Sequence, residues 1–482
     1  GMVVSAIEPS HAVAGRVYVA YDGHWSDDYG PHVYVSEDYG EEWREITEGL
    51  PVWSVNVVRE HPRTPELLFL GNEIGLYVSV DAGEHWRRFD ANFPTVPVDD
   101  IQLHPRDNDL IVATHGRSIW ILDDVSPLEA IARGPVLASA AHLFPVRPAI
   151  MWSIAPGGWF PADAYAVENP PVGARIRYWL REGVAPAAAE PVVTAADIDS
   201  RSRAEREFGG LDGLDEAERS AYASTPADAD RSADAAAPAA AADATVRLEI
   251  LDADGRVIRK LDGPGTAGIQ QVIWDFRMDP PYQPERREDG GRGRFRRAPR
   301  GPLVLPGTYT VRLIAAGDSM TTDVVVEQDP RIHVPRAELV ARQDAMMRVN
   351  ALAKPLYEAQ QAAREAARRL DAARELLKQS GADAKALLAE ADSLAARLEA
   401  ATDALGEAGA GRVQFAIEGI SARPTADQLW QIDQAWEKAP DAIRALNDLL
   451  TGDFAAFEAK VYQPAARPEP IGPIDVPTPP AN

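Results

Sequence analysis

Seven polar residues in the first quarter of the chain could form a ligand site. Four of them belong to the segment DGHWSDDYGP, residues 22–31, and three follow later strand-like runs. Carboxylates, imidazoles and a guanidinium beside aromatic residues are the groups that hold a polar ligand or a sugar. The candidate ligand-binding residues are Asp22, His24, Asp27, Asp28, Glu73, His115 and Arg117.

Each candidate also has a simpler interpretation. The oxygen and nitrogen donors of DGHWSDD could bind a cation, but their order differs from that of a calcium loop, so a solvated acidic loop is favoured. We therefore expect no metal and no cofactor. Arg117 could pair with a neighbouring acid, either Asp123 or Glu73, instead of binding a ligand. Glu73 could also form a glycosidase pair with Asp27 or Asp28, but most of such a site would have to come from elsewhere.

A repeated motif shows which elements position these residues. The pattern S-x-D-x-G-x-x-W occurs as VSEDYGEEW at residues 35–43 and as VSVDAGEHW at residues 78–86. A third unit, ending WILDDVSPL, lacks the motif. The flanking runs are rich in β-branched and aromatic residues, which predicts antiparallel strands with the motif in the turn between the last two strands of each unit. The structural residues of the motif are Ser36, Asp38, Gly40, Trp43, Ser79, Asp81, Gly83 and Trp86.

The alternation of loops in such a meander separates the motif from the candidate ligand residues. Turns between the third and fourth strands lie at one end of each unit, and turns between the second and third strands lie at the other. DGHWSDDYGP, NEIG and THGR all occupy the second kind of turn. The Asp of the motif is therefore expected to build a turn, its Trp is expected to pack between units, and any ligand site is expected at the opposite end.

The motif and the closing run ATHGRSIWILDD resemble the bacterial BNR-repeat (Asp-box), sortilin-like β-propeller proteins that are often labelled glycosyl hydrolases. The resemblance implies a propeller over residues 1–125 and a secreted or periplasmic protein. Propellers of that family have many more blades than the three found here, and three blades cannot close a ring. We therefore expect the missing blades to come from a longer protein or from a partner chain.

A second β region is expected after a connector at residues 126–171. The runs within residues 172–332 resemble the Ig-like domain of flagellar hook-capping proteins, with Trp274 and Phe276 in the core of a β-sandwich. Two insertions, 183–244 and 285–300, are expected to be disordered. The arginine-rich second insertion could bind RNA or an acidic surface, although charge balance within this acidic chain is favoured.

The last third of the chain is predicted to be helical. Apolar residues recur at spacings of three and four over residues 335–462, with an expected interruption near Pro355 and a helix start at Thr425. These helices predict a hairpin or bundle, followed by an extended proline-rich tail at residues 463–482. The fold class is therefore multidomain β plus α, with a partial propeller, an Ig-like sandwich and a helical bundle.

Composition excludes several classes of protein. The formal net charge of −25 disfavours nucleic acid as a partner, and the lack of cysteine excludes disulfides and thiolate sites. No apolar run is long enough to span a membrane, and the N-terminal segment does not resemble a signal peptide. We favour a binding or scaffold protein for a carbohydrate or peptide ligand over an enzyme. The alternative is a glycoside hydrolase whose active site is completed by the missing blades.

Overall fold

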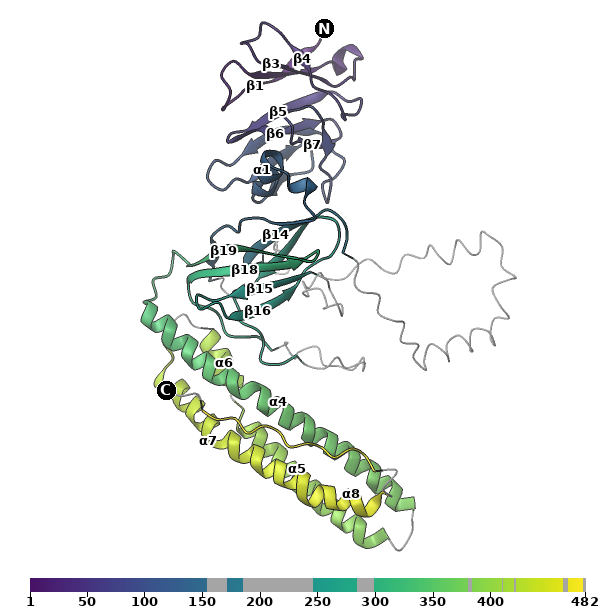
Figure 1. Ribbon diagram of the computed structural model, residues 1–482, viewed down its shortest axis with the longest axis vertical. Coiled ribbons are helices and arrows are strands. Elements are labelled where there is room, and N and C mark those ends of the chain that lie inside the picture. Colours follow the sequence, from purple (N-terminus) through teal and green to yellow (C-terminus); the bar gives the residue numbers. More distant parts are fainter. Residues whose placement is uncertain are drawn as a thin grey trace, which may run out of the picture.

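The computed structural model describes residues 1–153, 171–184, 246–283, 299–379, 384–409, 411–419, 422–462 and 467–479. From the N-terminus onward it contains a stack of three sheets, a unit of two further sheets, and an elongated helical bundle (Figure 1). The expected disordered insertions, 183–244 and 285–300, lie almost wholly outside the described residues.

The first two sheets are four-stranded antiparallel meanders in which each strand pairs with the next. Their short strands follow the β-branched and aromatic runs of the sequence and end at Asp, Gly and Pro residues. Sheet 1 contains β1 (Val3–Pro9), β2 (Val17–Asp22), β3 (His32–Ser36) and β4 (Arg44–Glu45). Sheet 2 contains β5 (Val55–His61), β6 (Thr64–Asn72), β7 (Gly75–Ser79) and β8 (Arg87–Arg88).

Sheet 3 has three strands and is followed by a short helix. Its order is β11-β10-β9, so β11 forms an edge. The helix α1 packs against sheets 2 and 3 through Leu128 and Ile131. The elements are β9 (Val98–Leu103), β10 (Leu110–Thr114), β11 (Ile119–Leu122) and α1 (Ser126–Arg133).

Sheet 2 lies between the other two and is buried on both faces. Leu68 and Leu70 of β6 belong to the core shared with sheet 1, and Leu67 and Phe69 belong to the core shared with sheet 3. A strand covered on both faces gains from apolar residues at every position, which explains the uninterrupted run LLFL. At Gly71 a Cβ atom would lie 2.5 Å from Val98 Cγ1, so only glycine lets sheets 2 and 3 approach this closely.

The two-sheet unit has a single core. Trp274 and Phe276 are buried in it at 0% and 1% exposure, with their ring centroids 5.8 Å apart. One sheet has the order β12-β14-β17 and the other β13-β19-β18-β15-β16, with β13 parallel to β19. The strands are β12 (Ala141–Leu143), β13 (Ala149–Met151), β14 (Ala174–Leu180), β15 (Arg247–Leu251), β16 (Val257–Asp262), β17 (Gly268–Trp274), β18 (Gly307–Ala315) and β19 (Asp318–Gln328). β12 and β13 come from the range expected to be a connector, and the Ig-like relationship stays a prediction.

The helical bundle buries one continuous core of Ala, Leu and Ile side chains. Thr425 caps α7 through a reciprocal pair of hydrogen bonds with Gln428, as the sequence indicates. The expected interruption near Pro355 is wrong, because α4 continues through this residue while Leu352 and Leu356 keep the helix packed on the core. The helical elements are α4 (Arg336–Gln379), α5 (Lys385–Glu407), α6 (Gly411–Glu418), α7 (Ala426–Leu449), the π-helix η5 (Leu450–Phe454) and α8 (Ala455–Val461).

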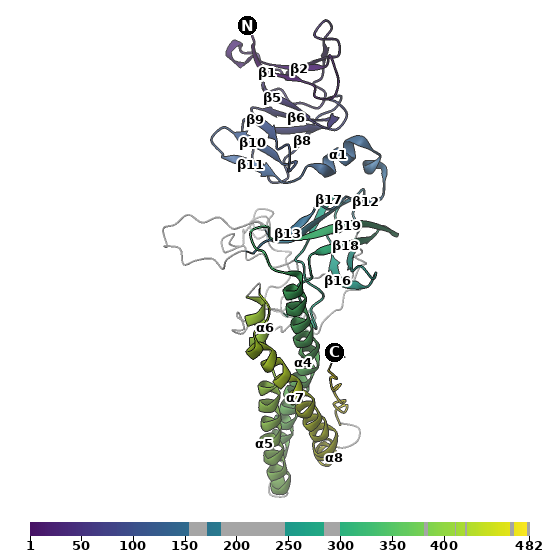
Figure 2. The ribbon, with the colours of Figure 1, turned by 90° about the vertical axis from the view of Figure 1, so that its left-hand side faces the viewer.

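The three parts follow one another along the long axis of the molecule (Figures 1 and 2). Within the described ranges, none of the helices combines the length and apolar character needed to cross a bilayer.

Candidate functional site

The first Asp-box turn lies between β3 and β4 and uses its polar atoms internally. The Ser36 hydroxyl donates to the Asp38 carboxylate over 2.8 Å and accepts the Gly40 amide over 2.8 Å. The same Asp38 oxygen accepts the amides of Glu41 and Glu42, each over 3.0 Å. The amide of Glu42 is the largest of the hydrogen-bond contributions that lower the pKa of Asp38. The carboxylate therefore remains charged and is engaged in shaping the turn.

The second Asp-box turn, between β7 and β8, repeats this geometry. Ser79 donates to Asp81 over 2.7 Å, and its hydroxyl accepts the Gly83 amide over 2.9 Å. Asp81 also accepts the His85 amide over 3.0 Å. Burial opposes ionisation of Asp81, but the hydrogen bonds from Ser79 and His85 outweigh it and lower the pKa of the carboxyl. Both Asp-box carboxylates therefore have lowered pKa values and bond within their own turns.

The two Asp-box tryptophans lie in different environments. The Trp86 side chain is buried and its indole N–H donates across the sheet interface to the Ile46 carbonyl over 2.8 Å. The Trp43 indole donates within its own turn to Gly40 over 3.0 Å, and the residue is 45% exposed. The Trp of sheet 2 thus packs against sheet 1, whereas the Trp of sheet 1 faces solvent instead of packing between units.

The loop between β2 and β3 carries the largest group of candidate residues. The His24 ring lies against Asp22, with Nδ1 2.5 Å from Oδ2 and 2.6 Å from Oδ1. Burial opposes ionisation of Asp22, but hydrogen bonds from the His24 amide and ring lower the pKa of the carboxyl. Asp28 lies 3.1 Å from His32 Nε2, and this contact lowers the Asp28 pKa. Asp27 ends the short helical turn with a positive φ of 59°.

Trp25 and Tyr29 of this loop and Trp53 of the segment before β5 are exposed aromatic residues. Together with Asp22 and His24 we call them the aromatic loop site. Trp25 is 80% exposed and its ring lies 4.6 Å from that of His24. Tyr29 and Trp53 are also exposed and contact each other edge to face, with centroids 6.4 Å apart. The site therefore presents apolar rings to solvent beside a carboxylate.

The remaining candidates lie on the next two loops at the same end of the strands. Glu73 follows β6, and its amide donates to the Ser54 carbonyl over 3.4 Å, which places it beside the segment holding Trp53. His115 follows β10, with its Nδ1 3.3 Å from Asp99 Oδ2. In the part of the chain that the structure describes, the Glu73 and Arg117 side chains have no hydrogen bond or ion pair. Arg117 thus pairs with neither Glu73 nor Asp123.

Tyr29 contacts Trp53 in the segment before β5, and that segment lies beside the second loop. The third loop makes no polar contact with the first two within the described residues. The same residues contain no cluster of three or more His, Asp or Glu side chains that could hold a metal ion.

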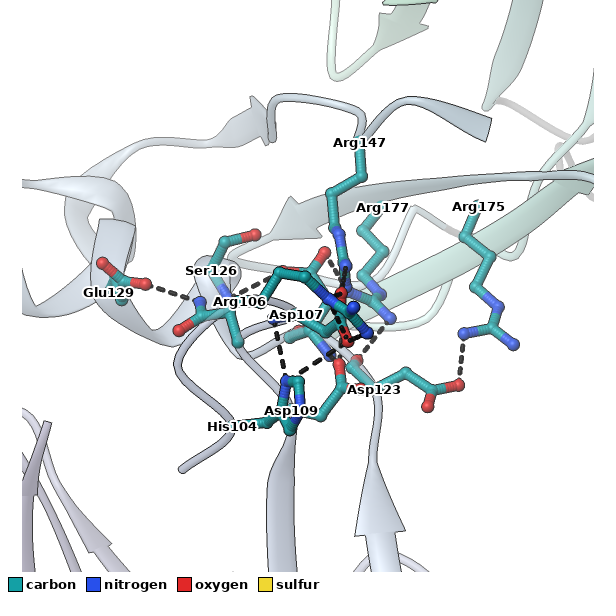
Figure 3. Close-up of polar contacts among 12 residues, drawn as sticks. His104, Arg106, Asp107, Asp109, Asp123, Ser126, Glu129, Arg147, Arg175 and Arg177 are labelled. Carbon is teal, nitrogen blue, oxygen red and sulfur yellow. Dashed lines mark hydrogen bonds and ion pairs between the residues drawn. The ribbon is translucent and has the colours of Figure 1, made fainter. Parts of the chain in front are cut away.

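A second polar region lies where sheet 3 meets the two-sheet unit. It is a cleft of about 720 Å³, which we call the junction cleft. Figure 3 shows arginines of the two-sheet unit pointing toward aspartates that follow the strands of sheet 3. Its charged lining residues are Asp107, Asp109, Asp123, Asp124, Arg147, Arg175, Arg177 and Arg331.

The charged side chains of the junction cleft form ion pairs with one another. Arg177 donates to Asp124 Oδ2 over 2.9 Å and to the Asp123 carbonyl over 2.8 Å, and Arg175 pairs with the Asp123 side chain. Burial is the largest influence on the Arg177 guanidinium and lowers its pKa. Arg147 lies 3.4 Å from Asp109. Because each arginine shown in the close-up already has an acidic partner, the cleft joins two folding units instead of presenting free charge (Figure 3).

Comparisons with known proteins locate the similarity in the sheet stack. The family model described as Sortilin, neurotensin receptor 3, matches residues 31–125, from the end of the first loop to the end of sheet 3. The expected resemblance to sortilin-like proteins is therefore confirmed over this range. No curated protein matches the chain.

Solved structures also match. One is an ancestral GH74 enzyme, with 26% sequence identity and a TM-score of 0.21, over 24% of this chain and 14% of that one. The chain thus spans a small part of that enzyme's length. An overlap of this size carries no conclusion about the activity of this protein.

Sequence reasoning placed Trp25 and Tyr29 on the ligand-side loop but missed Trp53. Trp53 precedes β5 in the segment PVWSV, and nothing in that segment alone distinguishes a surface ring from a core ring. Trp53 can be recognised as part of the site only when sheet 2 is packed against sheet 1, which brings its ring to Tyr29.

Proposed function

We propose that this protein is a binding or scaffold protein that recognises a glycan or peptide at the aromatic loop site. The observation that carries the proposal is the exposure of Trp25 and Tyr29 on one loop, with Tyr29 in contact with the exposed Trp53, at the end of the strands opposite the Asp-box turns. Exposed large rings gathered at one place are typical of binding surfaces. Aromatic faces can cover the apolar face of a sugar ring, and the Asp22 carboxylate can accept hydrogen bonds from hydroxyl or amide groups.

Charge narrows the ligand class. The chain is strongly acidic, and the carboxyls of Asp22 and Asp28 both have lowered pKa values, so the loop remains anionic near neutral pH. An anionic ligand would be repelled. Neutral oligosaccharides and uncharged or basic peptides fit this surface best. We also propose, from the resemblance to exported proteins, that the protein is secreted or periplasmic, which fractionation of the producing cell would test.

A binding screen with matched tryptophan variants tests the function. We expect one member of a panel of neutral glycans and peptides to bind the full chain. Trp25→Ala and Trp53→Ala should each weaken that binding at least about tenfold, the size expected for losing a central aromatic contact. Trp430→Ala removes another exposed tryptophan, from α7, and should leave the affinity unchanged.

The same panel separates binding from catalysis. If chromogenic glycosides are hydrolysed and Glu73→Gln abolishes turnover, the glycosidase interpretation replaces the binding one. Ligand binding that is insensitive to both Trp25→Ala and Trp53→Ala would also contradict the proposed site. An Arg117→Ala variant shows whether the third loop takes part.

A further inference from the structure

The proline-rich tail, residues 467–479, lies along the helical bundle. Its sequence is RPEPIGPIDVPTP, with no helix or strand assigned. The tail runs along the bundle toward the end nearest the two-sheet unit (Figures 1 and 2). The sequence predicts an extended tail, and the structure adds that it is seated on a surface.

The burial of the tail repeats every three residues. Pro468, Ile471, Ile474 and Pro477 are half-buried, while most residues between them are exposed. A polyproline II helix has three residues per turn, so residues at this spacing lie on one face. Ile471 and Ile474 pack against the bundle core, as does Val476. The tail therefore presents one apolar face to the helices.

The bundle also contacts the main chain of the tail. Asn447 of α7 donates through Nδ2 to the Ile474 carbonyl over 2.8 Å and accepts the Ile474 amide at Oδ1 over 2.9 Å. Arg369 of α4 donates to the Glu469 carbonyl over 2.7 Å. These contacts are to backbone atoms, so they do not depend on the side chains at those positions. Ile474 can pair reciprocally because it has an N–H, which the neighbouring prolines lack.

The groups that contact the tail are fixed by the bundle itself. Arg369 pairs with Glu365 over 2.8 Å and lies 3.7 Å from the buried Glu458 carboxylate. Asn447 lies in the last turn of α7, which leads into the π-helix η5, whose Leu450 and Phe454 are buried in the core. A surface whose polar groups are already oriented loses less entropy when it binds an extended peptide. We call the surface around Arg369 and Asn447 the tail-binding strip.

We propose that the tail-binding strip is a recognition site for proline-rich peptides in the polyproline II conformation. The ligand it would take has an apolar residue at every third position and one non-proline residue that pairs with Asn447. The tail fills the strip in cis, and a proline-rich segment of another protein with the same spacing displaces it. This inference is independent of the function proposed for the aromatic loop site.

Tethering sets the size of the expected competition. A short linker holds an attached ligand at an effective concentration in the millimolar range. For a peptide with a dissociation constant of roughly 0.1 mM, the tethered tail should weaken binding of an added copy by about tenfold. The competition is therefore measurable, and releasing the tail should remove it.

The test uses a fluorescent peptide with the sequence of residues 467–479 and the full chain. The double variant Ile471→Asp, Ile474→Asp releases the tail without shortening the protein. We expect the peptide to bind this variant about tenfold more tightly than it binds the unmodified chain. Adding Asn447→Ala to the double variant should abolish binding. Gln431→Ala removes an exposed amide of α7 elsewhere and is the matched control.

Equal peptide affinity for the unmodified chain and the double variant would overturn the proposal, as would binding that survives Asn447→Ala. A second measurement does not depend on peptide binding. Because the chain has no cysteine, spin labels can be placed specifically at Asp448→Cys and Asp475→Cys. One short distance is expected in the unmodified background and a broad distribution after Ile471→Asp, Ile474→Asp. A broad distribution in both would also overturn it.

Discussion

At the residue scale, one motif occurs in two settings. The Ser, Asp and Gly of both Asp-box turns make the same local hydrogen bonds, so the turn itself does not depend on neighbouring sheets. The tryptophans differ, because Trp86 meets a carbonyl of the preceding sheet whereas Trp43 bonds within its own turn. Local chemistry therefore builds the turn, and packing decides what the tryptophan contributes.

This difference leads to a stability prediction. Trp86→Phe removes the donor to the buried Ile46 carbonyl, and we expect it to lower the free energy of unfolding by about 1–3 kcal/mol. Trp43→Phe removes an exposed indole and should change stability by less than about 0.5 kcal/mol. Urea unfolding of both variants checks this. Equal losses would show that the two tryptophans are packed alike.

A buried histidine adds a pH dependence. His61 is fully buried, its Nε2 lies 2.9 Å from Asn108 Oδ1, and its Nδ1 accepts the Arg63 amide. Burial is the largest cause lowering the His61 pKa below its ordinary 6.5. The folded state therefore resists protonation. Neutral His61 therefore contributes to the free energy of unfolding. This contribution is fully present above pH 6.5 and is lost as the pH falls toward the lower folded-state pKa.

We expect the free energy of unfolding to decrease as the pH drops below about 6.5. His61→Gln cannot titrate and should reduce the slope in that window, leaving the contribution of His142, whose pKa burial also lowers. The carboxyl of Glu129 also contributes, but its pKa is lowered, because bonds from Arg63 and its other neighbours outweigh burial. Its stabilisation is lost only below pH 4.5, which keeps the two windows apart. A slope near pH 6 in His61→Gln as steep as that of the unmodified chain would contradict the assignment.

Sequence reasoning reached the Asp-box turns because their chemistry is local. Asp38 and Asp81 bond to amides within four residues, so the pattern alone specifies the structure. Contacts between distant parts of the chain are less predictable. In the junction cleft the partner of Asp123 is Arg175, more than 50 positions away, and no spacing rule could have indicated this pair. Trp53 was missed for the same reason.

At the element scale, the junction cleft holds the sheet stack to the two-sheet unit. The guanidinium of Arg177 in β14 donates to the backbone carbonyl and the carboxylate of Asp124 and to the backbone carbonyl of Asp123. The Arg177 side chain is largely buried. Removing one partner of a buried ion pair leaves an uncompensated charge, which costs more than the intact pair contributes. We therefore expect the junction to couple the unfolding of the two units.

Arg177→Met should uncouple them. Because Asp124 is left without its guanidinium partner, we expect the junction to lose about 3 kcal/mol of stabilising free energy. The single melting transition of the unmodified chain should separate into two in the variant. Differential scanning calorimetry measures both effects. Arg181→Met changes an exposed arginine at the end of the same strand and serves as the control. One unchanged transition in Arg177→Met would mean that the apolar contacts alone join the units.

The elements differed in how far their sequences revealed them. The helices were predictable because apolar spacing and the Thr425 cap are strong signals. The continuity of α4 through Pro355 was not, because tertiary packing outweighed the cost of the proline. β12 and β13 have three residues each, too few for any alternation to be recognised. They become strands by pairing with β14 and β19.

At the scale of the whole molecule, both ends of the sheet stack present apolar faces. On sheet 1, Val4 and Ile7 of β1 are 48% and 62% exposed, and Ile7 pairs with Val19 beside Tyr34. On sheet 3, Ile119 and Ile121 of the edge strand β11 are 66% and 61% exposed. Exposed apolar edges and faces of this kind favour association.

We propose that further four-stranded sheets of the same type cover these two faces. A sheet placed against sheet 1 would bury Trp43 as sheet 1 buries Trp86, supplying a carbonyl in the position of Ile46. When these faces are free, we expect the chain to self-associate as its concentration rises, as measured by sedimentation velocity. The double variant Ile7→Lys, Ile121→Lys should remain monomeric, because each lysine would have to be desolvated at the contact.

A matched variant separates this effect from general surface polarity. Phe415→Lys, Trp430→Lys places the same two charges on exposed apolar positions of the helical bundle and should not change the association. Melting temperatures should be nearly unchanged in both double variants, because all four side chains are exposed. If the unmodified chain is monomeric at every concentration, or if the bundle variant dissociates it equally well, the sheet faces are not the association surface. Dissociation by Ile7→Lys, Ile121→Lys alone would assign the contact to the two ends of the stack.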